Sequence, residues 1–200
     1  MVPPSCARNW KVELIRLNKM PNVLGALLLA LALLAPQLSH AREPFTLDAV
    51  RAQVKQDYAQ VSQLSADGLA RALKNKEGLL VLDVREKQEF AVSHIEGAQQ
   101  VNPGIWTWNF MSRFGDKVRG KTVVFYCSVG VRSSRLAASV QKVLKEQGAK
   151  AIYNLDGGVF GWHNEARALV NIEGSTSYVH PFDGVWGKLV KRQELVKSAP

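Results

Sequence analysis

The chain has 200 residues, 46% of them hydrophobic, and its 26 basic and 17 acidic side chains give a formal net charge of +9. That length and hydrophobic content are enough for one domain with a real core plus extensions. The basic residues are scattered among acidic ones and form no aromatic-interleaved stripe, which argues against nucleic-acid binding. Small anions, an acidic protein or anionic lipid head groups are the partners that such a charge attracts.

The N-terminal segment has the pattern of a signal peptide. Four basic residues and one acidic residue precede an uncharged, almost wholly aliphatic run over 23–35, which is too short for a comfortable transmembrane helix of about 20 residues. Ser39 and Ala41 supply the small residues of a cleavage site. We therefore expect residues 1–41 to be removed and the mature chain to be periplasmic or secreted, without a stable membrane span. An uncleaved anchor and a buried N-terminal helix are the alternatives.

The cysteine count points to a use for Cys127. After cleavage the chain keeps 22 basic and 16 acidic residues, and Cys127 is its only cysteine because Cys6 leaves with the signal peptide. No intramolecular disulfide is then possible. A lone thiol in an oxidising compartment is exposed to mixed disulfides and overoxidation unless it has a function.

The rest of the chain alternates helical patterns with short aliphatic runs. Apolar residues at helical spacing predict a short helix within 42–60 and another within 62–76, the latter with Ser65 as N-cap. The continuous apolar run Leu79–Leu82 predicts a central strand covered on both faces. Further strands are predicted at 99–101, 122–126 and 151–155. This order predicts an α/β fold in which a central, mostly parallel sheet has helices on both faces.

Cys127 lies between the strand at 122–126 and a helical pattern that starts near Ser133, with Ser133 or Ser134 as N-cap and Gly148 as its terminating residue. A helix start offers unpaired N–H groups and partial positive charge, and Arg132 adds a full charge, so a thiolate is favoured over the thiol. Gly130 lets the loop turn tightly, so that successive N–H groups point at the sulfur or at an anion that it carries. The alternative is that Cys127 is a small buried hydrophobe.

The pattern Cys-x-x-Gly-x-Arg-Ser between a strand and a helix resembles the active-site loop of rhodanese-type sulfurtransferases. Three further pieces of that family's pattern occur in the family's order, two before Cys127 and one after it. They are Asp83-Val84-Arg85 with Glu89-Phe90, then His94-Ile95-Glu96-Gly97-Ala98, and then Asp156-Gly157-Gly158 leading to Trp162. The resemblance covers residues 62–168, and implies a rhodanese-like three-layer domain flanked by a helical extension at 42–61 and an aromatic and basic tail at 169–200.

The resemblance implies that a sulfane sulfur passes from a donor such as thiosulfate, through a persulfide on Cys127, to cyanide or a thiol. The expected substrate-binding residues are those of the loop: Ser128, Val129, Gly130, Val131 and Arg132. The expected scaffold residues around the site are Asp83, Arg85, His94, Gly157 and Gly158. No organic cofactor or metal is needed, and His94 with Glu96 lacks recognisable metal-ligand spacing. A small sulfur-containing anion or thiol, and an acceptor protein, are the expected partners.

Two other functions fit parts of the pattern. Cysteine-dependent phosphatases also place a cysteine before a loop that ends in arginine at a helix start, but with five intervening residues. Here four residues separate Cys127 from Arg132, and the shorter loop encloses a cavity suited to one sulfur atom rather than a phosphate. A non-catalytic binding or redox-sensing module on the same scaffold is the second alternative.

Two aromatic segments are harder to interpret. Residues 105–114 contain four aromatic side chains, which either pack beneath a long loop or form an apolar wall at a pocket mouth that selects a partner protein or an organic sulfur donor. Residues 178–186 are too aromatic for a free linker, so we expect them to dock on the domain. The basic stretch Lys188–Lys197 is predicted to be a helix.

Overall fold

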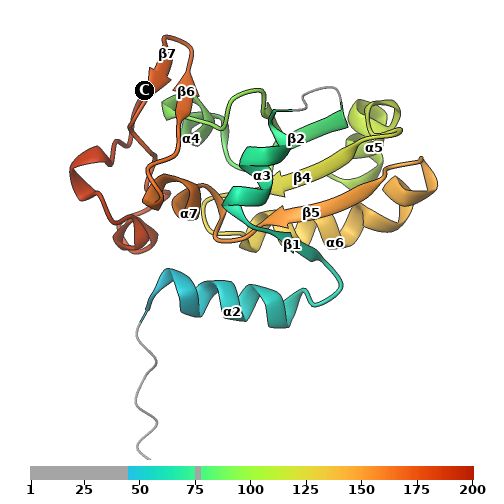
Figure 1. Ribbon diagram of the computed structural model, residues 1–200, viewed down its shortest axis with the longest axis horizontal. Coiled ribbons are helices and arrows are strands. Elements are labelled where there is room, and N and C mark those ends of the chain that lie inside the picture. The colour runs from blue at the N-terminus through green and yellow to red at the C-terminus, as the bar shows by residue number, and fades with distance from the viewer. Residues whose placement is uncertain (1–44, 75–77) are drawn as a thin grey trace, which may run out of the picture. The chain divides into compact units, whose positions relative to one another are not determined.

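The structure, a computed structural model, describes residues 45–74 and 78–200. Its centre is a five-stranded sheet in the order β1-β5-β4-β2-β3, in which every pairing is parallel (Figure 1). The strands are β1 (Ser62–Leu64), β2 (Leu79–Asp83), β3 (Gln99–Gln100), β4 (Thr122–Tyr126) and β5 (Ala151–Leu155). The predicted α/β fold is confirmed. The edge strand β1 was not predicted, because it contains no apolar run.

Helices cover both faces of this sheet. They are α2 (Leu47–Asp57), α3 (Ala66–Ala72), α4 (Lys87–Val92), α5 (Thr107–Phe114), α6 (Val131–Glu146) and α7 (Gly158–Asn164). Strand β4 shows how the two layers separate: Val123 and Phe125 lie in one core cluster, while Val124 and Tyr126 lie in the other. Because successive side chains of a strand point to opposite faces, a fully apolar strand such as β4 must be covered twice.

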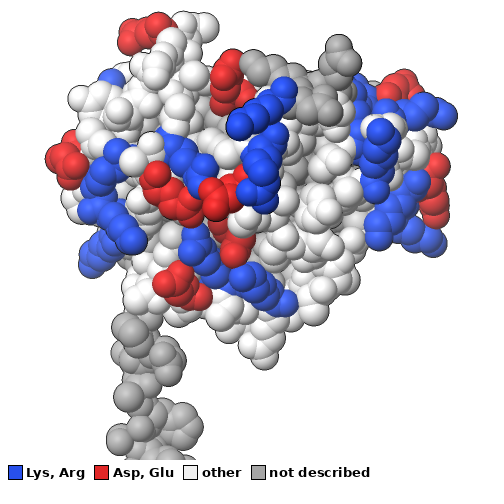
Figure 2. Space-filling view, in the orientation of Figure 1, with Lys and Arg blue, Asp and Glu red and all other residues white. Residues whose placement is uncertain are grey.

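The two cores use different helices. The first contains buried residues of α5 and α6, among them Phe110, Phe114 and Val140. The second contains residues of α3 and α7, such as Leu69 and Phe160, and extends to the C-terminal part of the chain. On the face drawn in Figure 2, basic side chains gather at both ends and in the centre, with acidic side chains interspersed among them.

The start of α6 differs from the prediction. The helix begins at Val131, with Gly130 as N-cap at φ +105°. A left-handed backbone at this position favours glycine, which ends the loop three or four residues earlier than a cap at Ser133 or Ser134 would. Ser133 and Ser134 are instead buried in the first turn, and the Ser133 hydroxyl donates to Asn154 Oδ1 at 2.6 Å. The predicted end is confirmed, because Gly148 follows the helix at φ +89°.

The tail also differs from the prediction. After a short antiparallel hairpin of β6 (Leu169–Asn171) and β7 (Gly174–Thr176), it forms only two 3-10 turns, η3 (Trp186–Leu189) and η4 (Gln193–Leu195). The helix predicted at 188–197 is therefore wrong. The side chain of Gln193 donates to the carbonyl oxygens of Gly187, at 2.9 Å, and Val190, which takes acceptors that a continuous helix would need.

The tail nevertheless docks on the domain, as expected from its apolar content. Val179, Leu189 and Val190 are buried in the second core, and the Trp186 ring lies 5.4 Å from that of Phe45. Tyr178 and Phe182 remain half exposed. We call residues 178–198 the C-terminal segment.

The aromatic stretch at 105–114 is buried in part, as its first interpretation expected, and the selection of a partner or donor by its exposed rings stays a prediction. It forms the last part of a loop and then α5, followed by the 3-10 turn η2 (Gly115–Lys117). Phe110 and Phe114 are fully buried, whereas Trp106 and Trp108 are 74% and 69% exposed. The phenylalanines build the core, and the tryptophans face solvent.

Within residues 45–74 and 78–200, no helix is both long enough and apolar enough to cross a bilayer. The aliphatic run at 23–35, the cleavage site expected after Ala41 and Cys6 lie outside the described residues.

Candidate active site

The segments singled out by the sequence meet at one edge of the sheet. Cys127 directly follows β4, Asp83 ends β2, and Gly157 lies two residues after β5. Strand β4 pairs with both β2 and β5 in parallel, so the carboxyl ends of all three strands face the same way. This edge is where open α/β sheets place their binding sites.

Cys127 lies beneath the start of α6. The residue is only 2% exposed, and its Sγ accepts the N–H of Gly130 at 3.2 Å. The 16-residue helix α6 begins one residue later, and the first N–H groups of a helix have no intrahelical acceptor. The sulfur therefore has one backbone donor, Gly130, and lies at the positive end of a helix dipole, and both favour negative charge on it. We call residues 127–132 the Cys127 loop.

The predicted glycine pair holds the Cys127 loop from the other side. The N–H groups that follow it, of Val159 and Phe160, donate to the carbonyl oxygens of Cys127 and Ser128, both at 2.9 Å. Gly158 has φ +57°, and a Cβ there would lie 2.6 Å from the Ser128 carbonyl oxygen, closer than real Cβ atoms come. Only glycine allows α7 to approach this loop so closely.

Arg132 does not extend freely toward solvent. Its Nη1 and Nη2 donate to the two carboxylate oxygens of Glu89, each at 2.8 Å, and Nη2 also donates to the Ser128 hydroxyl at 2.9 Å. That hydroxyl in turn donates to Glu89 at 3.0 Å. Burial alone would raise the pKa of the Glu89 carboxyl, but the hydrogen bonds and charge of Arg132 outweigh it and hold that pKa below its ordinary value.

Glu89 is therefore a component of the site that the sequence analysis did not assign. It lies on α4 with its side chain 3% exposed, 43 residues before Arg132 in the chain. The sequence did contain a signal for Glu89, because the pair Glu89-Phe90 belongs to the family's pattern. The sequence analysis assigned that pair no role in the site. The contact between Arg132 and a substrate anion stays a prediction. In this structure the guanidinium is paired with Glu89, so it would bind the anion while keeping that pair.

The expected scaffold residues make internal contacts. Arg85 is fully buried, donates from Nε and Nη2 to the carboxylate of Asp83 at 2.8 and 2.6 Å, and also reaches the Ser93 carbonyl at 2.7 Å. The His94 ring stacks on Phe90 at 3.7 Å, with Nδ1 3.0 Å from the Phe90 carbonyl oxygen. Burial lowers the pKa of His94, which keeps its ring neutral. These contacts fix the chain between β2 and β3, around Glu89.

The C-terminal segment reaches the same place, which nothing in the sequence indicated. The ring of Phe182 covers the Arg132 guanidinium at 4.6 Å. Phe182 has φ +67°, which is strained for a bulky residue, and its N–H donates to Nδ1 of His180 at 3.0 Å. His180 is largely buried, which lowers the pKa of its imidazole. The tail thus holds an aromatic ring against the charged pair Glu89–Arg132.

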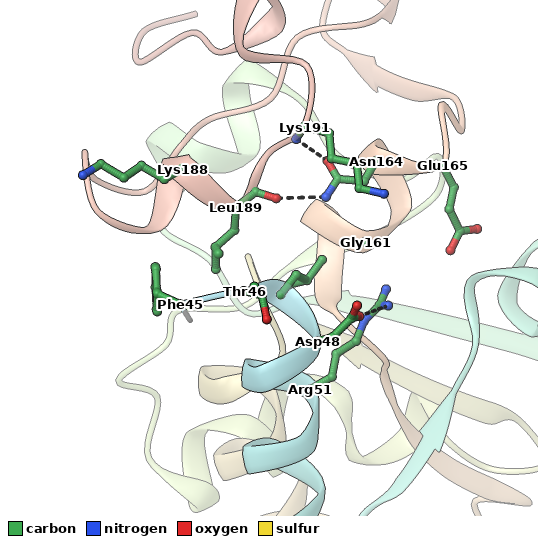
Figure 3. Close-up of a pocket in the computed structure, with 11 residues that line it drawn as sticks. Phe45, Thr46, Asp48, Arg51, Gly161, Asn164, Glu165, Lys188, Leu189 and Lys191 are labelled. Atoms are coloured by element: carbon green, nitrogen blue, oxygen red, sulfur yellow. Dashed lines mark hydrogen bonds and ion pairs between the residues drawn. The ribbon is translucent and has the colours of Figure 1, made fainter. Parts of the chain in front are cut away.

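A cavity of about 430 Å³ lies away from Cys127, between α2, α7 and the C-terminal segment (Figure 3). Asn164 anchors the segment there, donating to the Leu189 carbonyl at 2.9 Å and accepting the Lys191 N–H at 2.7 Å. The Arg51 guanidinium lies against Gly161, where a Cβ would be 2.6 Å from Nη2. Around this cavity, α2 and the C-terminal segment both contact α7.

Among the described residues, no group of three or more His, Cys, Asp and Glu side chains is arranged to hold a metal ion.

Comparisons with known proteins agree with this geometry. Residues 65–165 match the family profile of the Rhodanese-like domain. A sulfurtransferase of Allochromatium vinosum is 28% identical over 114 residues, which are 57% of this chain and 99% of that protein. A tRNA uridine(34) hydroxylase of Chlamydia trachomatis is 37% identical over 89 residues, which cover 42% of this chain and only 25% of the hydroxylase.

Similarity to a solved structure supports the fold alone. A thiosulfate sulfurtransferase from Pseudomonas aeruginosa superposes with a TM-score of 0.50 at 18% identity, over 63% of this chain and 23% of that one. This chain thus matches nearly the whole Allochromatium protein, but only about a quarter of the hydroxylase and of the Pseudomonas structure.

Proposed function

We propose that this chain, which belongs to the rhodanese-like domain family, is a sulfurtransferase that carries a sulfane sulfur as a persulfide on Cys127. The observation that supports this most directly is the position of the Cys127 sulfur, which accepts the Gly130 N–H at 3.2 Å beneath the start of α6. A sulfur held in that way is placed to act as a nucleophile and to bear a second sulfur. The similarity to the Allochromatium sulfurtransferase supports the same activity.

The reaction has two balanced steps. In the first, the Cys127 thiolate attacks the outer sulfur of thiosulfate, the sulfur–sulfur bond breaks, and sulfite leaves with the electron pair. Cys127 then carries a persulfide anion. In the second step, cyanide or a thiolate attacks the terminal sulfur and the Cys127 thiolate is released, so cyanide becomes thiocyanate. No net oxidation or external electron donor is involved.

The Cys127 loop stabilises the charge that moves in these steps. We expect the backbone N–H groups at the start of α6 to donate to the terminal sulfur, because such preorganised donors stabilise developing negative charge. Arg132 adds positive charge beside them, although Glu89 balances it. We therefore expect the backbone donors to contribute more to persulfide stability than the guanidinium does.

Intact mass measurement tests the proposal. We expect the mature protein to gain one sulfur atom after treatment with thiosulfate and to lose it after cyanide, with thiocyanate produced in equal amount. The Cys127→Ser variant, which keeps the shape of the loop, should gain nothing. Failure of the native protein to gain sulfur from thiosulfate or any other sulfane donor would refute the persulfide role and favour a non-catalytic binding or redox-sensing module.

We also propose that residues 1–41 direct export, on the basis of the basic start, the aliphatic run and the small residues before position 42. N-terminal sequencing of the protein recovered from a periplasmic fraction tests this. A mature chain that begins at Arg42 is expected, and recovery of the intact N-terminus in the cytoplasm would contradict it.

A further inference from the structure

A second cavity, of about 340 Å³, lies directly beside the Cys127 loop. It is formed by the loop that precedes α5 and by the first turns of α6, and its walls include Ile105, Trp106, Arg132, Arg135 and Leu136. Arg132 borders this cavity and also makes the contacts with Glu89 and Ser128 described above. Arg132 therefore belongs both to the Cys127 loop and to the wall of this cavity.

The lining of this cavity is cationic. It includes two arginines and no carboxylate, whereas four other cavities of the described residues each have at least one acidic side chain in their walls. The charge of Arg132 is balanced by Glu89. Arg135 is exposed and pairs with no carboxylate of the described residues. The free positive charge of the cavity therefore belongs to Arg135.

The size and apolar walls of the cavity indicate an organic occupant. Small-molecule sites typically measure about 300–1,000 Å³, and one water occupies about 30 Å³ of liquid, so 340 Å³ far exceeds what a five-atom inorganic ion fills. Trp106 is 74% exposed on one wall, and Leu136 forms part of the core beneath. An exposed tryptophan beside an unpaired arginine suits a molecule with both an apolar body and an anionic group.

We propose that this cavity binds the organic part of a carboxylate-bearing persulfide, with Arg135 pairing its carboxylate and Trp106 covering its carbon skeleton. The inference rests on the proposed function and names the class of its donor. In the transfer step, the Cys127 thiolate attacks the outer sulfur of the persulfide R–S–SH, where R is the carboxylate-bearing organic group. The sulfur–sulfur bond breaks, and R–S⁻ leaves with the electron pair. The proton stays on the transferred sulfur. Trp106 and Arg135 are then specificity determinants, and neither touches the reacting atoms.

Steady-state kinetics with two donors test this inference. Glutathione persulfide serves as the organic probe and thiosulfate as the inorganic one, with cyanide as the common acceptor and thiocyanate as the product measured. Arg135→Ala should raise KM for the persulfide about tenfold, the effect of one lost charge-assisted hydrogen bond, and Trp106→Ala should raise it several-fold. Both variants should leave KM for thiosulfate within about twofold, because that ion does not need the cavity.

Two exposed residues provide matched controls. Trp108 is 69% exposed but does not line the cavity, and Lys142 lies two helical turns beyond Arg135 on the same face of α6. Trp108→Ala and Lys142→Ala should change neither KM. A glutathione persulfide whose carboxylates are esterified gives a sharper comparison: its KM should exceed that of the free acid in the native protein, and the two should be equal in Arg135→Ala.

The outcomes separate the two proposals. If Cys127 gains sulfur but Trp106→Ala and Arg135→Ala affect both donors equally, or neither donor, the assignment of the cavity is wrong while the sulfurtransferase function stands. The assignment also fails if esterification still raises KM in Arg135→Ala. If the native protein accepts sulfur from neither donor, the proposed function fails, and the inference fails with it.

Discussion

The close approach of α7 to the Cys127 loop can be measured with a pair of glycine variants. Gly158 and Gly97 both have positive φ, +57° and +76°, but a Cβ at Gly97 would meet nothing within 4 Å. Alanine at either position costs roughly 1–2 kcal/mol of backbone strain. At Gly158 the Cβ also overlaps the carbonyl oxygens of Cys127 and Ser128, so α7 has to withdraw.

Withdrawal of α7 would break the hydrogen bonds from Val159 and Phe160 to the Cys127 loop, each worth about 1 kcal/mol. We therefore expect Gly158→Ala to lower the free energy of unfolding by about 3–4 kcal/mol and Gly97→Ala by only about 1–2 kcal/mol. That loss is tolerable for a domain with a stability of about 5–15 kcal/mol. Urea denaturation of both variants and the native protein measures the difference, and equal losses would refute the steric argument.

Three further predictions concern the groups around the Cys127 loop. Glu89→Gln should lower the free energy of unfolding by about 1–3 kcal/mol at pH 7. This is less than the cost of breaking a fully buried ion pair, because Arg132 is partly exposed. Because the folded pKa of Glu89 is lowered, native stability should decline as pH falls below about 5, and urea titrations should show a smaller decline in the variant. Burial lowers the pKa of His180, so the native protein should lose stability as pH falls through about 6.5. The variant His180→Asn, which still accepts a hydrogen bond, should lose less stability over the same pH range in thermal unfolding. Phe182→Ala should be less stable than Phe182→Gly by about 1 kcal/mol, because only glycine relieves the positive φ; an equal Tm for the two variants would show that the strain is absent.

The sequence predicted the parts of the fold that depend on local pattern. Apolar runs identified β2 and β4, because a parallel strand between two helical layers has no polar face, and the mainly apolar stretch 151–155 identified β5 despite its Asn154. The cysteine after β4 and the glycine pair after β5 could then be placed at one edge of the sheet, since parallel neighbours end together. Strand β1, Ser62–Leu64, was missed because three residues at an edge carry no such pattern.

What the sequence did not predict depends on contacts between distant residues. Glu89 contacts Arg132 across 43 positions, and no local spacing indicates that pair. Phe182 covers Arg132 from a segment outside residues 65–165, the part that matches the family. Local rules also failed at Gly130, where a backbone conformation open to glycine outweighed the capping preference of Ser133 and Ser134. The predicted cap therefore lay three or four residues too late.

The hydrogen bonds that join α7 to the Cys127 loop also determine how solvent reaches the site. The Val159 and Phe160 amides are buried and donate to carbonyl oxygens at the end of the central strand β4, so their protons can exchange with D₂O only when α7 separates from the sheet. Such amides exchange through the larger unfolding units of a protein rather than through local fraying. A sulfur on Cys127 is thus shielded on this side by the same cooperative unit that holds the fold together.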